Sequence, residues 1–395
     1  MTELRSGAYR SRRTVWEFLK GFAKVVIGGA LLLQAFLFIS VFALLLSILG
    51  AVSEGIEQSK APDVRANIKA GTTLYFNPVG ILAETSPGRD PIEEALDEVF
   101  GGRIGPVGIH DLVRVIQTAK DDERISAMVV DLQELAIPNI YLSKANLLAD
   151  AIEEFRDAGK RVWAVGDYYT QGQYLIASEA DEILLNHQGG VMLDGYGNYR
   201  LYYASLLERL DVTSHVFRVG TYKSAVEPYL RDDMSPEAKE AASKYLQVLW
   251  DATTSRIEAN RPIGPGTAKV YAETLPAVVR SSGGDLAEAA KSAGLVDRIV
   301  TRQELESFLT DKVGEDEDGE LNTVEFVDYA DDVKPPRNRP TIDDVMIVTV
   351  QGPIMDGDNE PGVASGEYVS EKLREARETE SVKAVVLRVD SPGGS

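Results

Sequence analysis

The sequence predicts an α/β fold, in which a mainly parallel sheet with covering helices follows an N-terminal transmembrane helix. Three observations predict it. Strand-like apolar runs alternate with helix-like segments from residue 72 onward. No charged residue lies between Lys24 and Glu54. The strand–helix–strand order of the first part also begins again after residue 343, which indicates a repeat.

The composition of the 395-residue chain argues against several kinds of site. The net charge is −21 with no offsetting basic stripe, so the chain would be repelled by nucleic acid. There is no cysteine, which excludes disulfides, thiolate catalysis and cysteine-based zinc sites. His110, His187 and His215 lack the spacing of metal ligands. With no Walker or dinucleotide motif either, we expect no metal and no cofactor.

The uncharged run at residues 25–53 is long enough to cross a membrane. A helix crosses the hydrocarbon core, ~30 Å thick, in about 20 residues. A cleaved signal peptide has a shorter apolar core of about 7–15 residues, so we expect a retained anchor. Basic residues precede the run, and Glu54 and Glu57 follow it. This asymmetry predicts a cytoplasmic tail at 1–24 and a stalk at 54–71 outside the cytoplasm.

The first α/β unit is expected at residues 72–310. Cap signals support three of its helices: Asp90 with Pro91, Ser143 with a closing Gly159, and Ser235 with Pro236. Apolar runs between the helices predict buried strands. The expected strands are 73–84, 125–132 and 161–169, the helices are 89–100, 110–122, 142–160 and 235–260, and the segments 172–186 and 283–300 each hold a helix followed by a strand.

A linker is expected at residues 311–343, because this segment is rich in charge and proline. Residues 314–325 partly match a calcium-binding EF-hand loop. Position 1 of that loop requires an aspartate, however, and here it is Gly314. We therefore interpret the segment as a solvated linker.

A second unit begins at residue 344, with strands at 345–357 and 382–395 around a helix at 365–378. The segment 124–132 aligns with 381–389 at an offset of 257 residues, and the preceding helices align too. The first copy continues far beyond this strand, whereas the second stops at residue 395 without a helix to cover it. We therefore expect 344–395 to be the start of an incomplete second repeat.

One lysine has an unusual setting. A β-like run, Val216–Val219, ends at Gly220, and Lys223 follows among small and apolar residues. The nearest carboxylate along the chain is Glu227. Most lysines are solvated and have no special role. A buried lysine without a counter-ion can instead lose its proton and act as a base.

The segment HVFRVGTYKSAVEPYLRDDMSPEAKE (residues 215–240) and the turn VVLRVDSPGGS (385–395) resemble the long, two-repeat form of the signal peptide peptidase A family, also called protease IV. The uncharged anchor, QYLIASEADEILLN and LVDRIV match as well. The resemblance implies repeats of the crotonase/Clp-protease type. It also implies a serine protease with a Ser/Lys dyad, whose two catalytic groups come from different repeats.

Carried onto this sequence, the resemblance makes Lys223 the general base and Gly393 and Gly394 oxyanion-stabilising or substrate-binding residues. In the first repeat Gln171 stands where the nucleophile would be, and an amide is no nucleophile. The equivalent position in the second repeat is about residue 428, at the repeat offset of 257, so the nucleophile is not in this chain. Ser391 and Ser395 are expected to be turn residues.

The resemblance further implies a membrane-anchored endopeptidase on the periplasmic side of a bacterial inner membrane. Its substrates would be cleaved signal peptides and unfolded hydrophobic peptides, and its assembly a homotetramer. Two alternatives remain open at this point. One is an inactive fragment or peptide-binding scaffold of the same fold, and the other is an acyl-CoA enzyme of the crotonase type.

Overall fold

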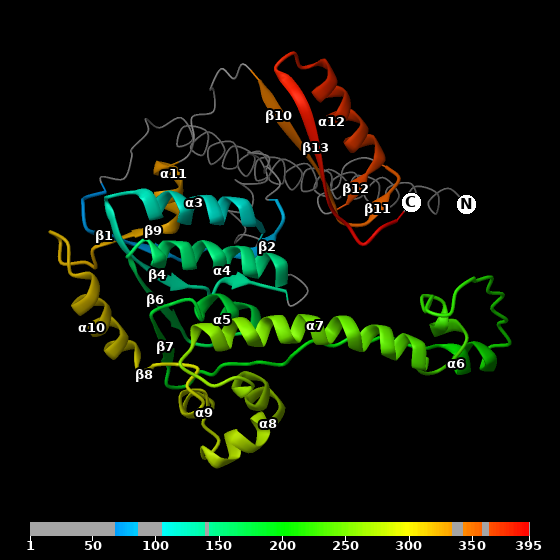
Figure 1. Cartoon of the computed structure of the whole chain (residues 1–395), viewed down its shortest axis with the longest axis horizontal. Helices are drawn as coiled ribbons and strands as arrows, with labels where there is room; N and C mark the ends of the chain where they lie inside the picture. Colours follow the sequence, from blue (N-terminus) through cyan, green and yellow to red (C-terminus); the bar gives the residue numbers. More distant parts are fainter. Residues whose placement is uncertain (1–67, 86–104, 139–141, 334–342, 358–362, 395) are drawn as a thin grey trace, which may run out of the picture. The chain divides into compact units, whose positions relative to one another are not determined.

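The computed structural model describes residues 68–85, 105–138, 142–333, 343–357 and 363–394 (Figure 1). The chain divides into two compact parts, and all the described residues belong to one of them. That part contains both α/β repeats, which are called the first and the second unit below. The predicted tail, anchor, helix at 89–100 and stalk as far as residue 67 lie outside the described residues. Within the described residues, no helix combines the length and the apolar character needed to cross a membrane.

A six-stranded parallel sheet forms the centre of the first α/β unit, in the order β8-β7-β6-β4-β1-β9. Its inner strands β4 and β6 are mostly apolar and buried, as expected for a sheet that is covered on both faces. The predicted parallel sheet is thus confirmed. The strands are β1 (Thr72–Phe76), β4 (Ile125–Asp131), β6 (Arg161–Gly166), β7 (Glu182–Asn186), β8 (Arg298–Val300) and β9 (Thr323–Glu325).

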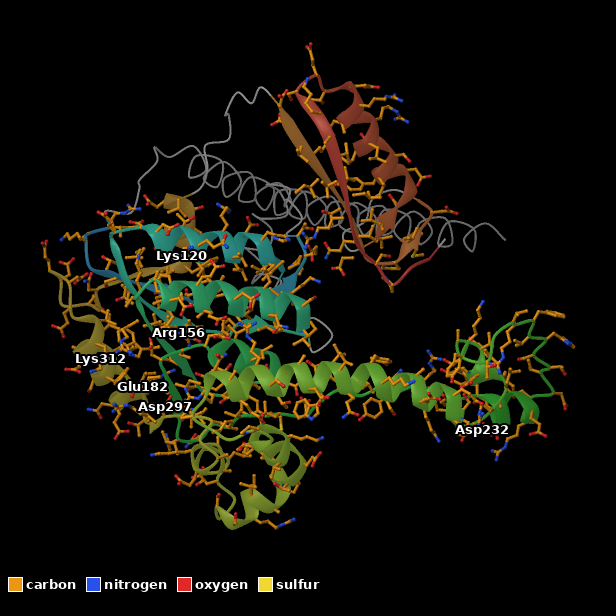
Figure 2. The ribbon with its side chains drawn as sticks, viewed as in Figure 1. Lys120, Arg156, Glu182, Asp232, Asp297 and Lys312 are labelled. Atoms are coloured by element: carbon orange, nitrogen blue, oxygen red, sulfur yellow. The ribbon has the colours of Figure 1, made fainter. Side chains whose placement is uncertain are left out.

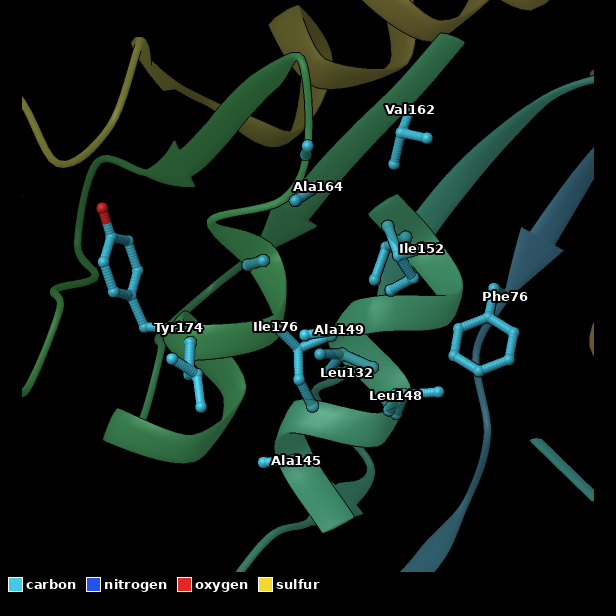
Figure 3. Close-up of a cluster of buried hydrophobic side chains, with 14 of the residues drawn as sticks. Phe76, Leu132, Ala145, Leu148, Ala149, Ile152, Val162, Ala164, Tyr174 and Ile176 are labelled. Carbon is cyan, nitrogen blue, oxygen red and sulfur yellow. The ribbon is translucent and has the colours of Figure 1, made fainter. Parts of the chain in front are cut away.

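Helices cover both faces of this sheet. The helices α3 (Ile109–Asp121), α4 (Leu142–Asp157) and α5 (Gln171–Ala177) contribute to the larger apolar core. Figure 3 shows part of it, with Leu148 and Ile152 of α4 near Phe76 of β1. On the opposite face, α10 (Arg302–Val313) packs on a smaller core. Alternate residues of the strands supply the two cores, since successive side chains of a strand point to opposite faces.

The single strand predicted at 73–84 is wrong, because the structure has two strands there in different sheets. Strand β1 ends at Phe76, and β2 (Gly80–Ala83) joins a small parallel sheet with β3 (Pro106–Gly108) and β5 (Leu135–Ala136). Pro78 separates the two strands, since it has no backbone N–H to donate to a ladder. At Gly80, where φ is +143°, a Cβ would lie 2.3 Å from Val107 Cγ2, so only glycine fits.

Two of the cap predictions can be checked against α4 and α7 (Pro236–Asn260). Helix α4 begins at Leu142, so Ser143 lies in its first turn. The prediction that Ser143 is the N-cap of this helix is therefore wrong. Gly159 does end this helix region with φ +87°, and its N–H donates to Arg156 O at 2.8 Å. At α7 the predicted cap is confirmed, because Ser235 Oγ accepts from Ala238 N at 3.1 Å.

Two of the longer helices among the described residues were not predicted. Helix α8 (Thr267–Ser281) carries Pro276 in its interior, where a proline usually breaks a helix. Helix α10 was missed although Thr301 and Glu304 form a capping box, a pattern visible in the sequence TRQE. The predicted helix and strand at 283–300 are present as α9 (Leu286–Ser292) and β8.

The segment 311–343 is not all linker, contrary to the prediction. Strand β9 pairs with β1 at the edge of the main sheet, and α11 (Phe326–Asp332) follows it. Tyr329 of α11 is fully buried and donates to Asp122 Oδ2 at 3.1 Å. The charged composition of the segment concealed its few apolar residues, and these place it in the first unit as far as Asp332.

The second unit repeats the topology of the first. Strands β10 (Asp344–Gln351) and β13 (Val382–Asp390) are parallel and joined through α12 (Gly366–Glu378), as β1 and β4 are joined through α3. Helices α3 and α12 begin 257 residues apart, at residues 109 and 366. Both strand pairs also shift register after their first residue. Strands β11 (Ile354–Met355) and β12 (Ala364–Ser365) form a second parallel pair, as β2 and β3 do.

Candidate functional site

The predicted base lies on an arm formed by residues 199–235 at the N-terminal end of α7. The arm contains the short helix α6 (Ala204–Arg209) and a 3₁₀ turn at Glu227–Tyr229. Figure 1 shows α6 at the end of α7 that is remote from the main sheet, and Figure 2 places Asp232 in the same region. Asp232 Oδ1 accepts from Ser205 N at 2.9 Å and so ties the start of α6 to the chain that precedes α7.

Lys223 lies in a turn of this arm, and its side chain is exposed. Its N–H donates to Gly220 O at 3.4 Å, and its carbonyl accepts from Arg218 Nη1 at 2.7 Å. The β-like run at 216–219 does not form a strand, because this stretch pairs with no other backbone segment among the described residues. The apolar surroundings expected for Lys223 are therefore not provided by the described part of a single chain.

The nearest carboxylate along the chain does not pair with Lys223. Glu227 is 2 % exposed, and its Oε2 accepts from Ser235 N at 3.2 Å. Burial alone would raise the pKa of Glu227, but the hydrogen bonds from Ser235 and the charges of Arg231 and Arg218 outweigh it and lower that pKa. Glu227 is thus committed to other partners, as a neutral lysine nearby would require.

The arm carries an unusual amount of exposed apolar surface. Phe217 and Tyr199 are 98 % and 96 % exposed, and Val219 is 86 % exposed. Contiguous apolar surface of this kind marks a site that another protein segment or a membrane covers. The other large exposed apolar residues of the arm are Leu201, Tyr203, Leu206, Leu210, Val212, Tyr222, Tyr229 and Leu230.

The predicted glycine turn follows β13. Gly393 and Gly394 have φ of +104° and +148°, which favour glycine. The carbonyl of Gly393 accepts from Ile354 N at 3.0 Å, and a Cβ on Gly394 would lie 2.0 Å from Ile354 O. Ser391 Oγ accepts from Gly393 N at 3.1 Å, which is the contact of a turn residue. Ser395 lies outside the described residues.

Gln171 occupies the first position of α5, directly after the N-cap Thr170. Its side chain is 2 % exposed. The amide oxygen accepts from Gly195 N at 2.8 Å, and the amide nitrogen donates to Gly195 O at 3.4 Å. The position that the resemblance gives to a nucleophile is therefore filled here by a side chain bonded to the backbone of another loop.

A cavity of about 190 Å³ lies where several strands of the main sheet end. Tyr75 Oη donates to Asp131 Oδ2 at 3.1 Å, and Asn186 Nδ2 to Asp167 Oδ1 at 2.8 Å. Burial raises the pKa of Asp131 and also that of Tyr75. No lysine, serine or histidine is among the described residues that line this cavity, so it does not hold the serine and lysine pair that the resemblance implies.

The EF-hand-like segment has a backbone role in the structure. Asp316 Oδ1 accepts from the N–H groups of Asp318 and Glu320 at 2.9 and 3.0 Å. Glu325, the last residue of the pattern, accepts from Asn77 Nδ2 at 2.6 Å instead. Across the residues that the structure describes, no three acidic or histidine side chains gather as a metal site would require.

The predicted site residues remain apart in the described chain. No hydrogen bond or ion pair among the described residues joins Lys223 to the turn at Gly393 and Gly394. Sequence reasoning also missed a group of charges at the end of β13, in which the buried Lys144 contacts the partly exposed Asp390. The sequence signal that could have revealed this group is Lys144, a lysine on the apolar face of the helix predicted at 142–160.

Comparison with known proteins identifies the family. Residues 154–314 match the model of peptidase family S49. "Protease 4" from Salmonella typhi is 35% identical over 387 residues, which cover 97% of this chain and 61% of that protein. "Protease 4" from Haemophilus influenzae is 37% identical over 356 residues, covering 90% of this chain and 57% of its own. The chloroplastic serine protease SPPA of Arabidopsis thaliana is 24% identical over 296 residues, covering 69% of this chain and 39% of that one.

Solved structures with a similar arrangement are more distant. An enoyl-CoA hydratase/isomerase family protein from Silicibacter pomeroyi has a TM-score of 0.31 at 13% identity, covering 52% of this chain and 69% of that one. Pseudomonas aeruginosa DspI has a TM-score of 0.28 at 15% identity, covering 52% and 63%. Likenesses of this size support neither a fold assignment nor a function.

The sequence relatives are therefore the informative matches. This chain spans 61% and 57% of the length of the two bacterial ones. The match to the family model includes the predicted lysine and much of the first α/β unit. The chain belongs to the signal peptide peptidase A (protease IV) family, within peptidase family S49.

Proposed function

We propose that this chain is part of a membrane-anchored serine endopeptidase in which Lys223 is the general base of a Ser/Lys dyad. One observation carries the proposal. Glu227, the nearest carboxylate in sequence, is bonded to Ser235, and no carboxylate of the described residues is paired with Lys223 although the chain has 62 acidic side chains. A base lysine has to be neutral, and an ion pair would hold its proton.

The nucleophile in this proposal is a serine of the second repeat, C-terminal to the glycine turn. The greater length of the two bacterial relatives leaves room for it. The neutral amine of Lys223 takes the proton of the serine hydroxyl as that oxygen attacks the peptide carbonyl. An amide N–H of the turn at Gly393 and Gly394 donates to the oxyanion that forms. The Lys223 ammonium then gives its proton to the leaving amine, which restores the base.

The exposed arm supports an assembled state of the enzyme. In the described chain the Lys223 side chain is exposed, whereas a base lysine acts in an apolar site from which water is excluded. The apolar side chains around it, with Phe217 98 % exposed, suit a cover that excludes water. We place that cover in the remainder of the second repeat and in neighbouring copies of a homotetramer.

The substrates we propose are cleaved signal peptides and other unfolded hydrophobic peptides, on the periplasmic side of a bacterial inner membrane. Residues 25–53 would anchor the enzyme where such peptides are left after preprotein processing. The apolar character of the arm also suits a peptide-binding scaffold without activity. This second candidate predicts peptide binding that is independent of Lys223.

The test uses the complete protein and a hydrophobic signal peptide as substrate. Lys223→Ala should abolish hydrolysis while the mass of the assembly by light scattering stays unchanged. Lys244→Ala is the matched control, because Lys244 is exposed and pairs only with Glu240 of its own helix among the described residues. Near-normal turnover by Lys223→Ala would overturn the proposed base, and binding without hydrolysis by the unaltered protein would favour the scaffold.

A further inference from the structure

A group of charged side chains lies between the end of β2 and the end of β13. Glu84 and Lys144 are 5 % and 6 % exposed. Lys144 Nζ lies 2.9 Å from Asp390 Oδ2 and 3.6 Å from Glu84 Oε2. Arg388 also contacts Glu84, and His110 Nε2 lies 3.1 Å from Glu84 Oε1. We call Glu84, Lys144, Arg388 and Asp390 the inter-repeat cluster, because two of its members come from each repeat.

Burying Glu84 and Lys144 costs free energy, since both charges lose their hydration, whereas Arg388 and Asp390 stay partly exposed. Apolar residues of similar size often stabilise a fold as well or better. What buried ion pairs supply in the best-documented cases is a single defined register between elements. The two cations and two anions of the inter-repeat cluster balance, so a shift of β13 against α4 would deprive the buried Glu84 and Lys144 of their second-repeat partners.

The inter-repeat cluster and the neighbouring Thr85 hold the carboxyl ends of β10 and β13. Gln351 of β10 and Asp390 of β13 are register partners. Thr85, next to Glu84, donates its Oγ1 to Gln351 Oε1 at 2.8 Å. Gly352 N donates to Asp390 O at 3.0 Å. The short segment after β2 in the first repeat thus contacts the end of β10, and Lys144 contacts the end of β13.

The glycine turn begins directly after this anchor. Asp390 precedes Ser391 and Pro392, and the turn then bonds to Ile354 through Gly393 O. Gly394 approaches Ile354 too closely for any side chain. The turn is therefore fixed on its upstream side by the Asp390 carboxylate and on its downstream side by the backbone of β11.

We propose that Lys144 is a positioning residue which, through Asp390, fixes the turn at Gly393 and Gly394 against the first repeat. The direction in which the turn's amide groups face a substrate is then set by a residue of the first repeat. The placement of the turn follows from the contacts above. Its consequence for catalysis rests on the proposed endopeptidase function.

The first test measures placement alone, by hydrogen exchange of the complete protein. Lys144→Met should make the amides of Asp390, Ser391, Gly393 and Gly394 exchange roughly tenfold faster, with little change in β4 and β6. Asp390→Asn should give the same local change, and it leaves the burial of α4 intact, because the Asp390 side chain is 35 % exposed. Lys120→Met is the matched control, since Lys120 pairs with Glu154 on the surface of α3 and α4 (Figure 2). Unchanged exchange at 390–394 in both variants would overturn the proposal.

The second test measures the consequence for peptide hydrolysis. Both variants should lower kcat roughly 100-fold with KM changed by no more than about twofold, as expected when reacting groups are misplaced. Lys144→Arg should recover most of kcat, and the double variant should be no worse than either single one, because both remove the same contact. A wild-type kcat in both variants would overturn the role of Lys144. Absence of hydrolysis in the unaltered protein would instead refute the endopeptidase function, and the exchange result would still decide the placement.

Discussion

Arg256 of α7 donates its Nε to Glu179 Oε1 at 2.6 Å, and Glu179 has no exposed side-chain surface. Asn260, one turn further along α7, donates to the same oxygen at 2.5 Å. Arg256 Nη1 also lies 2.5 Å from Asp150 of α4. The helix that carries the arm is therefore anchored to the rest of the first unit mainly through the buried carboxylate of Glu179.

Replacing Arg256 by methionine should lower the free energy of unfolding by about 3 kcal/mol, because the buried Glu179 would lose its hydrogen-bonded cation and keep only Arg156, whose Nη2 lies 3.8 Å from Glu179 Oε2. Burial already raises the pKa of Glu179, and Arg256 counteracts this rise. Urea unfolding of the variant measures the loss. Glu179→Gln in the same chain should recover part of it, whereas Lys244→Met on the exposed part of α7 should cost less than about 0.5 kcal/mol. A loss below about 1 kcal/mol for Arg256→Met would show that α7 is held by other contacts.

Gly394→Ala should disrupt the turn after β13, because the new Cβ would lie 2.0 Å from Ile354 O. Hydrolysis by the complete protein should fall roughly 100-fold or more if the turn supplies an oxyanion donor. Gly366→Ala is the matched control, since a Cβ at that position meets no atom within 4 Å. Equal activities of the two variants would show that the turn supplies no group that hydrolysis requires.

The ionised Asp122 should stabilise the first unit at neutral pH, and this contribution to the free energy of unfolding should be lost in acid. Its hydrogen bonds with Arg124, with a further one from Tyr329, hold the pKa of Asp122 below its usual value. A carboxyl group whose folded-state pKa is lowered contributes stability above its unfolded pKa, near 3.9, and that contribution is lost as the pH falls through the lower folded value.

Asp122→Asn tests this directly. The variant should lose about 1–3 kcal/mol of unfolding free energy at pH 7, and the difference from wild type should shrink below about pH 4. Thermal unfolding at both pH values measures the effect. Asp111→Asn, at an exposed pair with Arg114, should have little effect at either pH. A difference that stays constant down to about pH 2 would contradict the role of the charge.

Phe217→Ser should weaken the proposed tetramer, because Phe217 is 98 % exposed on the arm and would be covered only in an assembly. Light scattering of the complete protein over a dilution series should show the variant dissociating at roughly tenfold or higher concentrations than the wild type. Val270→Ser removes an exposed apolar residue of α8 and serves as control. Identical dissociation curves for all three proteins would remove the arm from the interface.

Much of the fold could be predicted because local signals agreed with tertiary structure. The run ISAMVVD forms a buried strand, and Ser235 caps α7 as expected. The offset of 257 residues between the repeats holds for α3 and α12 and for β4 and β13, whereas β1 and β10 begin 272 residues apart. The predictions failed where the structure of a segment depends on contacts with residues far away in the sequence. Val324 and Tyr329 become core residues only because β1 and Asp122 lie beside them.

The sequence by itself determined the parallel α/β architecture, the repeat and the residue types of the candidate site. Periodic apolar patterns, caps and glycines act over a few residues, so they can be found without coordinates. Only the tertiary structure decided that Lys223 is exposed on an arm, that Glu227 is committed to Ser235, and that Lys144 contacts Asp390. Burial and ion pairing depend on groups far apart in the chain, which sequence spacing does not bring together.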